Sequence, residues 1–193
     1  MENEKQEKTN KRAALLEVAL VLFSQRGYTG TSVQEIVNLA GVTKPTLYYF
    51  FKNKQGIYAA LWDEYFVPFN ESLQEKCNYI PSPKEYEKDV FGQLCDIAQL
   101  YYAFCKKNPV FYRLMLSLQF SPEDAEGIST IQQLYEKNYT QITAFFNKAS
   151  KTHGNLKGKT SLLARIFIAD VYAGIEADIP VNAIVKLFMH GIY

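Results

Sequence analysis

Cysteine and histidine are scarce in this chain of 193 residues, which contains three Cys and two His. Cys77, Cys95 and Cys105 form no C-x-x-C pair, and only His153 and His190 are present to join them. An odd number of cysteines without metal-ligand spacing argues against both a disulfide framework and a zinc site. We interpret the thiols as small hydrophobic side chains in a reducing compartment, with a redox-sensing cysteine as the less favoured alternative.

Long apolar runs are also missing. A membrane-spanning helix requires about 20 predominantly apolar residues. The best candidate, residues 166–177, is interrupted by Asp170 and Glu176. The amino terminus, MENEKQEKTNKR, is charged and lacks the apolar core of a secretory signal. We therefore expect a soluble, cytoplasmic protein.

The patterns that would indicate an enzyme are absent from the sequence. We find no Ser-His-Asp set, no glycine-rich phosphate loop, no metal-ligand spacing and no paired catalytic carboxylates. The two histidines offer little material for acid–base chemistry. We therefore expect no enzymatic activity, no cofactor and no metal ion.

The net charge is only +1, which by itself does not indicate a nucleic-acid-binding protein. Its distribution is more informative. Residues 1–60 hold eight Lys or Arg against five Asp or Glu, whereas residues 61–193 hold thirteen against fifteen. The basic excess is confined to the amino-terminal part of the chain, which fits an end that faces a nucleic acid.

Apolar residues recur with helical spacing along almost the whole chain, and no segment alternates like a strand. We predict an all-α fold of about nine helices, preceded by a frayed terminus. A kink or early end is expected at Pro68, and Ser121 with Asp124 is expected to cap a long helix. The expected helical ranges are 9–26, two short helices within 32–52, a helix from residue 54, 85–106, 109–118, 121–150, 160–177 and 181–189.

Residues 31–52 have the spacing of a helix-turn-helix. Ser32 followed by Glu35 is a capping box at the start of a two-turn helix. Gly41 supplies the tight turn, and Thr43 can cap the second helix.

On a helical wheel, Leu47, Phe50 and Phe51 fall within one narrow arc, which must face the preceding helices. The opposite face presents groups that can contact base edges, a thymine methyl or phosphates: Lys44, Pro45, Thr46, Tyr48 and Tyr49. Lys54, near the next helix start, can hold a phosphate together with the amide dipoles. Short capped helices with a glycine turn occur in other helical proteins, and exposed tyrosines can belong to a protein interface, so the spacing alone leaves that alternative open.

The sequence GYTGTSVQEIVNLAGVTKPTLYYFFKNKQGIYAAL resembles the amino-terminal signature of the TetR family of bacterial repressors. The family pattern is a Thr-initiated helix, an Ala-Gly-Val turn, a Ser/Thr-Lys-x-Thr-Leu-Tyr-Tyr-x-Phe stretch and a Lys near the start of the fourth helix. The match covers roughly residues 10–62. It departs at Val37, where the family often has Ala, and at Gly56, where an acidic residue is common; both are packing or capping positions.

The resemblance implies a nine-helix, all-α homodimer with two DNA-reading heads. By family position, the residues that would approach bases are Thr43, Lys44, Pro45, Thr46 and Tyr48, and those that would hold phosphates are Thr31, Tyr49 and Lys54. Ser32, at the cap, completes the predicted DNA-binding set. The resemblance also implies that the last two helices form a four-helix dimer interface, and it names no ligand.

Residues 61–193 contain twenty-one of the twenty-eight aromatic residues. Each is expected to be core, but together they also suit a pocket for an apolar or planar effector. We predict that Asp96 and Arg113 pair with each other or with the ligand, although a solvated helix face explains Asp96 and Gln99 equally well. The predicted pocket residues are Tyr65, Phe66, Asp96, Gln99, Tyr102, Phe111, Arg113, Met115, Tyr135 and Tyr139.

Apolar stripes mark the last two expected helices, and exposed stripes of that width favour a dimer. Asp170 lies inside the first stripe, where it can meet Arg165 or a residue of the partner. The predicted dimer residues are Leu162, Ile166, Ala169, Ala173, Ile184, Leu187 and Phe188.

We therefore predict a helix-turn-helix DNA-binding domain over residues 1–52 and a helical ligand-binding and dimerisation domain over residues 53–193. The expected function is sequence-specific transcriptional regulation by a homodimeric repressor. Its partners would be a double-stranded DNA operator and a small-molecule effector, with no membrane. The alternative is a structural or division-linked DNA-binding protein that has no effector.

Overall fold

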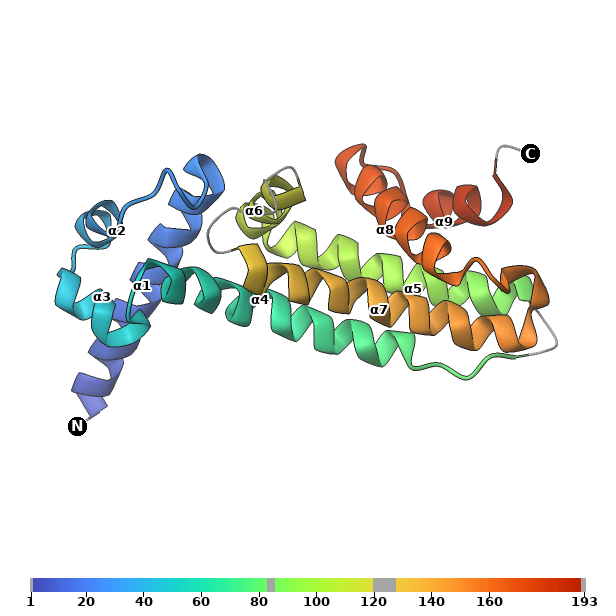
Figure 1. Cartoon of the computed structure of the whole chain (residues 1–193), viewed down its shortest axis with the longest axis horizontal. Coiled ribbons are helices and arrows are strands. Elements are labelled where there is room, and N and C mark those ends of the chain that lie inside the picture. Colours follow the sequence, from blue (N-terminus) through green and yellow to red (C-terminus); the bar gives the residue numbers. More distant parts are fainter. Residues whose placement is uncertain (1, 83–85, 120–127, 192–193) are drawn as a thin grey trace. The chain divides into compact units, whose positions relative to one another are not determined.

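The computed structural model describes residues 2–82, 86–119 and 128–191, and within these ranges the regular secondary structure is entirely helical (Figure 1). The predicted all-α fold is therefore confirmed. The helices are α1 (Glu2–Arg26), α2 (Val33–Leu39), α3 (Lys44–Phe51), α4 (Lys54–Cys77), α5 (Tyr86–Lys107), α6 (Pro109–Gln119), α7 (Ile128–Thr152), the short 3₁₀ helix η1 (Gly154–Leu156), α8 (Thr160–Glu176) and α9 (Val181–His190).

The chain divides into two compact units. Unit 1 comprises Met1–Pro68 and Asn108–Leu134, and unit 2 comprises Phe69–Lys107 and Tyr135–Tyr193. These units differ from the domains predicted at residues 1–52 and 53–193, because the first half of α4 and the whole of α6 pack with α1. As a division of function, the two predicted domains remain a prediction.

Two helix boundaries differ from the sequence-based expectation. Helix α1 begins at Glu2, where a frayed end was expected up to Thr9, because i,i+4 contacts such as the Lys11–Glu7 ion pair at 2.6 Å support its polar first turns. Helix α4 continues through Pro68 to Cys77 and does not end early. The expected cap of Ser121 and Asp124 lies outside the described residues.

Unit 1 is built on the apolar face of α1, where Leu15, Ala19 and Phe23 are fully buried at a spacing of four residues. Helix α1 contacts α2, α3 and α6. A chain of aromatic rings extends this core, with centroid distances of 4.9 Å from Phe23 to Tyr58 and 5.0 Å from Trp62 to Phe111. The ring contacts join α1, the first half of α4 and α6 into the support on which α2 and α3 rest.

Unit 2 has α5 at its centre, in contact with α8 and α9 (Figure 1). Phe69, at the start of the second half of α4, packs edge-to-face on Tyr101 of α5 at 4.9 Å between centroids. A second cluster joins the last three long helices through Phe167, whose centroid lies 6.4 Å from Phe146 and 5.3 Å from Phe188. Among the described residues, Leu162 and Ile166 on α8 and Leu187 on α9 are exposed.

Within the described ranges, no helix is both long and apolar enough to cross a membrane. The same residues contain no group of three or more His, Cys, Asp or Glu side chains placed to hold a metal ion. All three cysteines are free thiols; Cys77 and Cys105 are buried and Cys95 is half-buried.

Candidate functional site: an exposed helix-turn-helix face and a polar cluster in unit 2

Helix α2 begins with the predicted capping box. The Ser32 hydroxyl accepts a hydrogen bond from the backbone N–H of Glu35 at 3.2 Å, and the Glu35 carboxylate accepts one from the backbone N–H of Ser32 at 3.1 Å. The Ser32 hydroxyl and backbone hydrogen bonds lower the pKa of Glu35, which also pairs with Arg26 at 2.6 Å. The cap therefore fixes where α2 starts and ties it to the end of α1.

The turn between α2 and α3 is closed by backbone bonds. Gly41 adopts φ +65°, a left-handed conformation that favours glycine, and the N–H of Val42 donates to the carbonyl of Val37 at 3.0 Å. Thr43 occupies the N-cap of α3, as predicted, but its side chain makes no capping hydrogen bond. Its hydroxyl is 3.0 Å from the Thr46 hydroxyl, so the two side chains form a polar pair on the outer face of α3.

Helix α3 divides into a buried and an exposed side, as the helical wheel predicts. Leu47 and Phe51 are buried against unit 1 and Phe50 is half-buried. Tyr48 is 46% exposed and Tyr49 is 70% exposed, which is unusual for large aromatic side chains. Lys44 and Pro45 are exposed beside them, and Thr46 is half-buried. The outer side thus presents one cation, two hydroxyl-bearing rings and two threonine hydroxyls.

Thr31 and Lys54 have structural contacts that the sequence did not reveal. Thr31 is only 2% exposed, and its hydroxyl donates to the carbonyl of Gly27 at 2.9 Å. This hydrogen bond holds the Thr31 hydroxyl inside unit 1, and the phosphate contact of Thr31 stays a prediction. The Lys54 ammonium donates to the carbonyls of Tyr28 and Thr31 at 3.0 and 3.1 Å, which fixes the segment that leads into α2.

A sequence model described as bacterial regulatory proteins of the tetR family matches residues 15–61, which span the end of α1, the capped α2, the turn, α3 and the start of α4. These residues carry the amino-terminal sequence of the TetR family. The resemblance read from the helix-turn-helix residues is thereby confirmed.

The chain is similar to curated transcriptional regulators over part of their length. The transcriptional regulator AcrR of Shigella flexneri is 44% identical over 59 residues, which are 31% of this chain and 27% of AcrR. The match thus spans about a quarter of the length of that relative. Its name describes a transcriptional regulator and not an enzyme.

Solved structures extend the likeness of fold to nearly the whole chain. The regulator FadR of Bacillus subtilis, in complex with stearoyl-CoA, has a TM-score of 0.71 at 17% identity and covers 94% of this chain and 99% of its own. SmeT, in complex with triclosan, has a TM-score of 0.69 at 15% identity and covers 95% and 94%. At such identities the likeness shows only that the chain has the same fold.

The predicted pocket residues do not gather in one unit. Asp96 is exposed and pairs with Lys76 at 3.0 Å, which fits the solvated helix face that the sequence left open. Gln99 and Arg113 are also exposed, and these three residues therefore do not line an interior pocket. The remaining members are buried or half-buried within unit 1, namely Tyr65, Phe66, Phe111 and Met115, or within unit 2, namely Tyr102, Tyr135 and Tyr139.

A buried polar cluster in unit 2 was missed by the sequence analysis. Tyr101 donates its hydroxyl proton to Oδ1 of Asn138, and Nδ2 of Asn138 donates to Oδ1 of Asn70 at 3.4 Å. Nε2 of Gln141 donates to the backbone carbonyl of Asn70 at 3.0 Å. Burial raises the pKa of Tyr101 well above its usual range, so this hydroxyl remains a donor. The signal available in the sequence was the spacing of Asn70, four residues after Phe66 on the inward side of α4.

Two atoms of this cluster have no hydrogen-bond partner among the described residues. They are Nδ2 of Asn70 and Oε1 of Gln141, one a donor and one an acceptor. An unsatisfied buried polar group costs about 1–3 kcal/mol, so a site of this kind favours a polar group that supplies the missing bonds. None of the four side chains in the cluster carries a charge.

The predicted dimer residues separate into exposed and buried sets. Leu162, Ile166 and Leu187 are exposed large apolar side chains, and Ala169 and Ala173 are exposed between them. Ile184 is buried against Gly174 of its own chain, and Phe188 is half-buried and packs on Phe167, so the interface role of these two residues stays a prediction.

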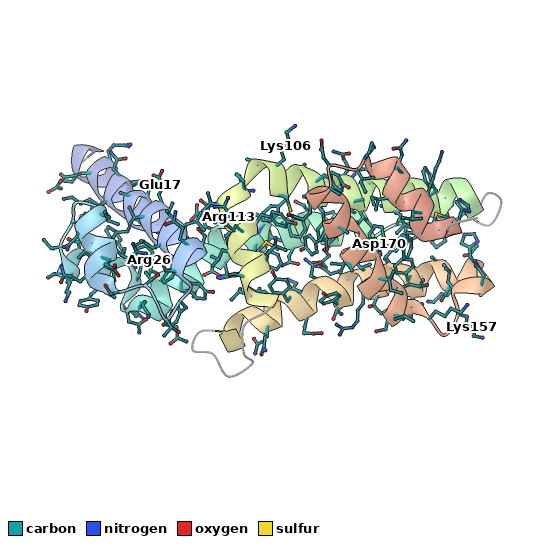
Figure 2. The ribbon with its side chains drawn as sticks, turned by 90° about the horizontal axis from the view of Figure 1, so that it is seen from above. Glu17, Arg26, Lys106, Arg113, Lys157 and Asp170 are labelled. Atoms are coloured by element: carbon teal, nitrogen blue, oxygen red, sulfur yellow. The ribbon has the colours of Figure 1, made fainter. Side chains whose placement is uncertain are left out.

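Asp170 lies on α8 within the exposed stripe (Figure 2). Burial raises the pKa of its carboxyl group. Arg165 instead approaches Glu136 at 3.8 Å and stacks over the Tyr139 ring at 4.7 Å, so the expected pairing of Asp170 with Arg165 is not formed.

Proposed function

We propose that the chain is a homodimeric repressor that binds a specific DNA operator and is released by a small apolar or aromatic effector. The observation that carries the proposal is the outer side of α3, where Tyr48 and Tyr49 are exposed next to Lys44 and the Thr43–Thr46 pair. Two adjacent large aromatic rings exposed on a short helix indicate a surface that a partner covers. A helix with this surface fits the major groove.

The chemistry of each side chain suits it to contact either bases or phosphates. Thr43, Thr46 and Lys44 supply donors to base edges, and the carbons of Pro45 can contact a thymine methyl. Tyr49 donates its hydroxyl to a phosphate. Lys54 uses two of its three N–H donors on the carbonyls of Tyr28 and Thr31, so the third is free to hold a phosphate while the first two position α2.

The effector proposal rests on unit 2. Its interior combines aromatic side chains with the uncharged cluster of Asn70, Tyr101, Asn138 and Gln141, which leaves one donor and one acceptor unpaired. An apolar molecule with a single hydroxyl group would pack on the aromatic side chains, and its hydroxyl could bond both the unpaired donor and the unpaired acceptor. Structures of the same fold have been solved with stearoyl-CoA and with triclosan, which supports the choice of an apolar or aromatic effector.

Homodimerisation through the exposed parts of α8 and α9 would place two reading heads on one operator, so the proposal expects a near-palindromic site. The effector would act by favouring a dimer in which the spacing of the heads no longer matches successive major grooves. A bacterial regulator of chromosomal genes acts in the cytoplasm, and we propose that location.

Selection of bound fragments from genomic DNA at near-physiological salt tests the proposal. Recovery of a short palindrome is the expected result, and binding to the recovered duplex should then weaken when triclosan or stearoyl-CoA is added. Asn70→Leu should keep the affinity for DNA and lose the response to the effector. Recovery of scattered, unrelated fragments, with no ligand raising the melting temperature, would favour the structural DNA-binding protein instead.

A further inference from the structure

A groove runs along unit 1 between the first turns of α1 and the end of α3. It has a volume of about 640 Å³. One face of α1 forms a wall, because residues at spacings of three and four lie on the same side of a helix. The lining residues are Glu4, Lys5, Lys8, Thr9, Arg12, Ala13, Tyr49, Phe50 and Glu64.

The cations of the groove differ in how they are neutralised. Arg12 pairs with Glu64 at 3.3 Å and lies over the Phe51 ring at 5.7 Å, so its charge is neutralised within unit 1. Lys5 and Lys8 are exposed, and neither has an ion-pair partner among the residues that the structure describes. Lys11 pairs with Glu7 and does not line the groove. Two ammonium groups on the α1 wall are therefore available to an external anion.

Tyr49 connects this groove to the DNA-reading side of α3. Its ring is 70% exposed and lines the groove, and the adjacent Tyr48 belongs to the side that we propose to face bases. The ring of Phe50 lies 5.0 Å from that of Tyr49 at an angle of 74°, so the two rings form a fixed end of the groove. A duplex that contacts Tyr48 and Tyr49 would continue past this end.

We propose that the groove binds the sugar–phosphate backbone of the DNA that flanks the sequence read by α3, through Lys5 and Lys8. This inference rests on the proposed function, because it requires α3 to dock on a duplex. DNA is the occupant that fits, since its backbone presents successive anions to two lysines three residues apart and its sugars can pack on the edges of the Tyr49 and Phe50 rings. An apolar peptide would leave both ammonium groups uncompensated.

Glu4 is the feature of the groove that opposes this partner. It lines the groove and has no ion-pair partner among the described residues. A carboxylate near the bound backbone repels phosphates, so its removal should strengthen binding. The groove is therefore predicted to add affinity through two lysines and to lose part of it through Glu4.

The experiment compares two duplexes that share the palindrome recovered by genomic selection. The long duplex keeps about one helical turn, roughly ten base pairs, of flanking DNA on each side, and the short duplex ends at the palindrome. Affinity is measured as a function of salt for the wild type and for the double variant Lys5→Ala with Lys8→Ala. Alanine is expected to preserve the helix, and circular dichroism checks this. The matched control is Lys11→Ala with Lys106→Ala, which removes the same charge from exposed positions outside the groove; Lys106 lies near the end of α5 (Figure 2).

On the long duplex, the double variant should lower the slope of log affinity against log salt by about 2 for each reading head, because each lost phosphate contact contributes about 0.9. Glu4→Gln should raise the affinity. On the short duplex, wild type and double variant should bind alike, and the control should match the wild type on both.

Equal affinity and slope for wild type and double variant on the long duplex would overturn the inference and leave the proposed function intact. Failure to recover any specific duplex would overturn both.

Discussion

The ammonium of Lys54 lies 4.1 Å from the centre of the Tyr28 ring. It also donates to the carbonyls of Tyr28 and Thr31, so one side chain joins the start of α4 to the segment between α1 and α2. The same Tyr28 ring packs on Phe23 and Tyr58. A residue that the sequence assigns to DNA contact thus also has a structural task in unit 1.

Lys54→Ala should therefore lower the stability of the free protein as well as its affinity for DNA. Loss of the cation–π contact and of two charged hydrogen bonds predicts a decrease of about 1–2 kcal/mol in the free energy of unfolding, because the site is half-buried. Lys54→Arg should retain most of that stability. Urea denaturation of both variants checks this, and unchanged unfolding of Lys54→Ala would refute the structural task.

Thr46→Ala and Tyr49→Phe should have separable effects on DNA binding. Thr46 is proposed to face bases, so its truncation should change the preference at one position of each half-site by about 1 kcal/mol. Tyr49 is proposed to reach a phosphate, so loss of its hydroxyl should weaken binding to every sequence alike. Both residues are uncharged, and the salt slope should stay as in the wild type. Binding to a panel of single-base operator variants distinguishes them; a uniform loss for Thr46→Ala would contradict its assignment.

The helix-turn-helix structure was largely predictable because local signals determine it. The Ser32–Glu35 capping box, Gly41 in the turn and the spacing of Leu47 and Phe51 each act over a few residues. The hydrogen bonds of Lys54 within unit 1 were not predicted. Its carbonyl partners lie more than twenty residues earlier in the chain, and backbone acceptors carry no sequence signature.

Gly174→Ala should destabilise unit 2, where helices α5, α8 and α9 approach closely. A Cβ at this position would collide with the Tyr102 hydroxyl and lie 2.6 Å from Cγ1 of Ile184. Overpacking of this kind costs about 1–3 kcal/mol. Gly92→Ala is the matched control, because a Cβ at that position on α5 meets nothing within 4 Å and should raise stability by about 0.5–1 kcal/mol. Chemical denaturation should move the two variants in opposite directions; equal shifts would show that α8 can adjust.

The buried thiols predict how stability depends on pH. Burial raises the pKa of Cys77 and of Cys105 to about 12, against about 8.5–9 in an unfolded chain. The folded state therefore holds these protons longer than the unfolded state. Their contribution is fully present below pH 9 and is lost as the pH rises toward 12, by about 1.4 kcal/mol per pH unit for each thiol. Unfolding midpoints measured from pH 8 to pH 11 should fall steadily, and Cys77→Ser with Cys105→Ser should flatten the fall; a flat wild-type profile would contradict the assignment.

The same environment predicts the order of thiol modification. Cys95 is half-buried, whereas Cys77 and Cys105 are buried, and the thiolate is the reactive form. At pH 8 a disulfide reagent should label Cys95 first, and the other two only upon unfolding. Labelling of all three at one rate would show that unit 2 opens readily.

The interior of unit 2 was harder to predict because a helical period identifies an apolar face but not which polar residue lies within it. Asp96 lies among apolar residues in sequence, yet its carboxylate reaches Lys76 at the surface. Asn70 and Asn138 come from α4 and α7, and only the packing of these helices brings their amides together. The burial of such a pair depends on tertiary contacts, which a short stretch of sequence does not reveal.

The exposed apolar side chains of α8 and α9 give the sharpest test of the dimer. Leu187 is 49% exposed on α9, and Leu39 is 66% exposed on α2 in unit 1. If α8 and α9 bury their stripes against a second copy, Leu187→Glu places an unpaired charge in that interface and should convert the dimer to monomers at micromolar concentration. Leu39→Glu makes the same chemical change on a surface outside the proposed interface and should leave the dimer intact. Sedimentation velocity separates the two species. A Leu187→Glu variant that remains dimeric would place the interface elsewhere, whereas dissociation confined to this variant would assign it to the stripe that also contains Leu162 and Ile166.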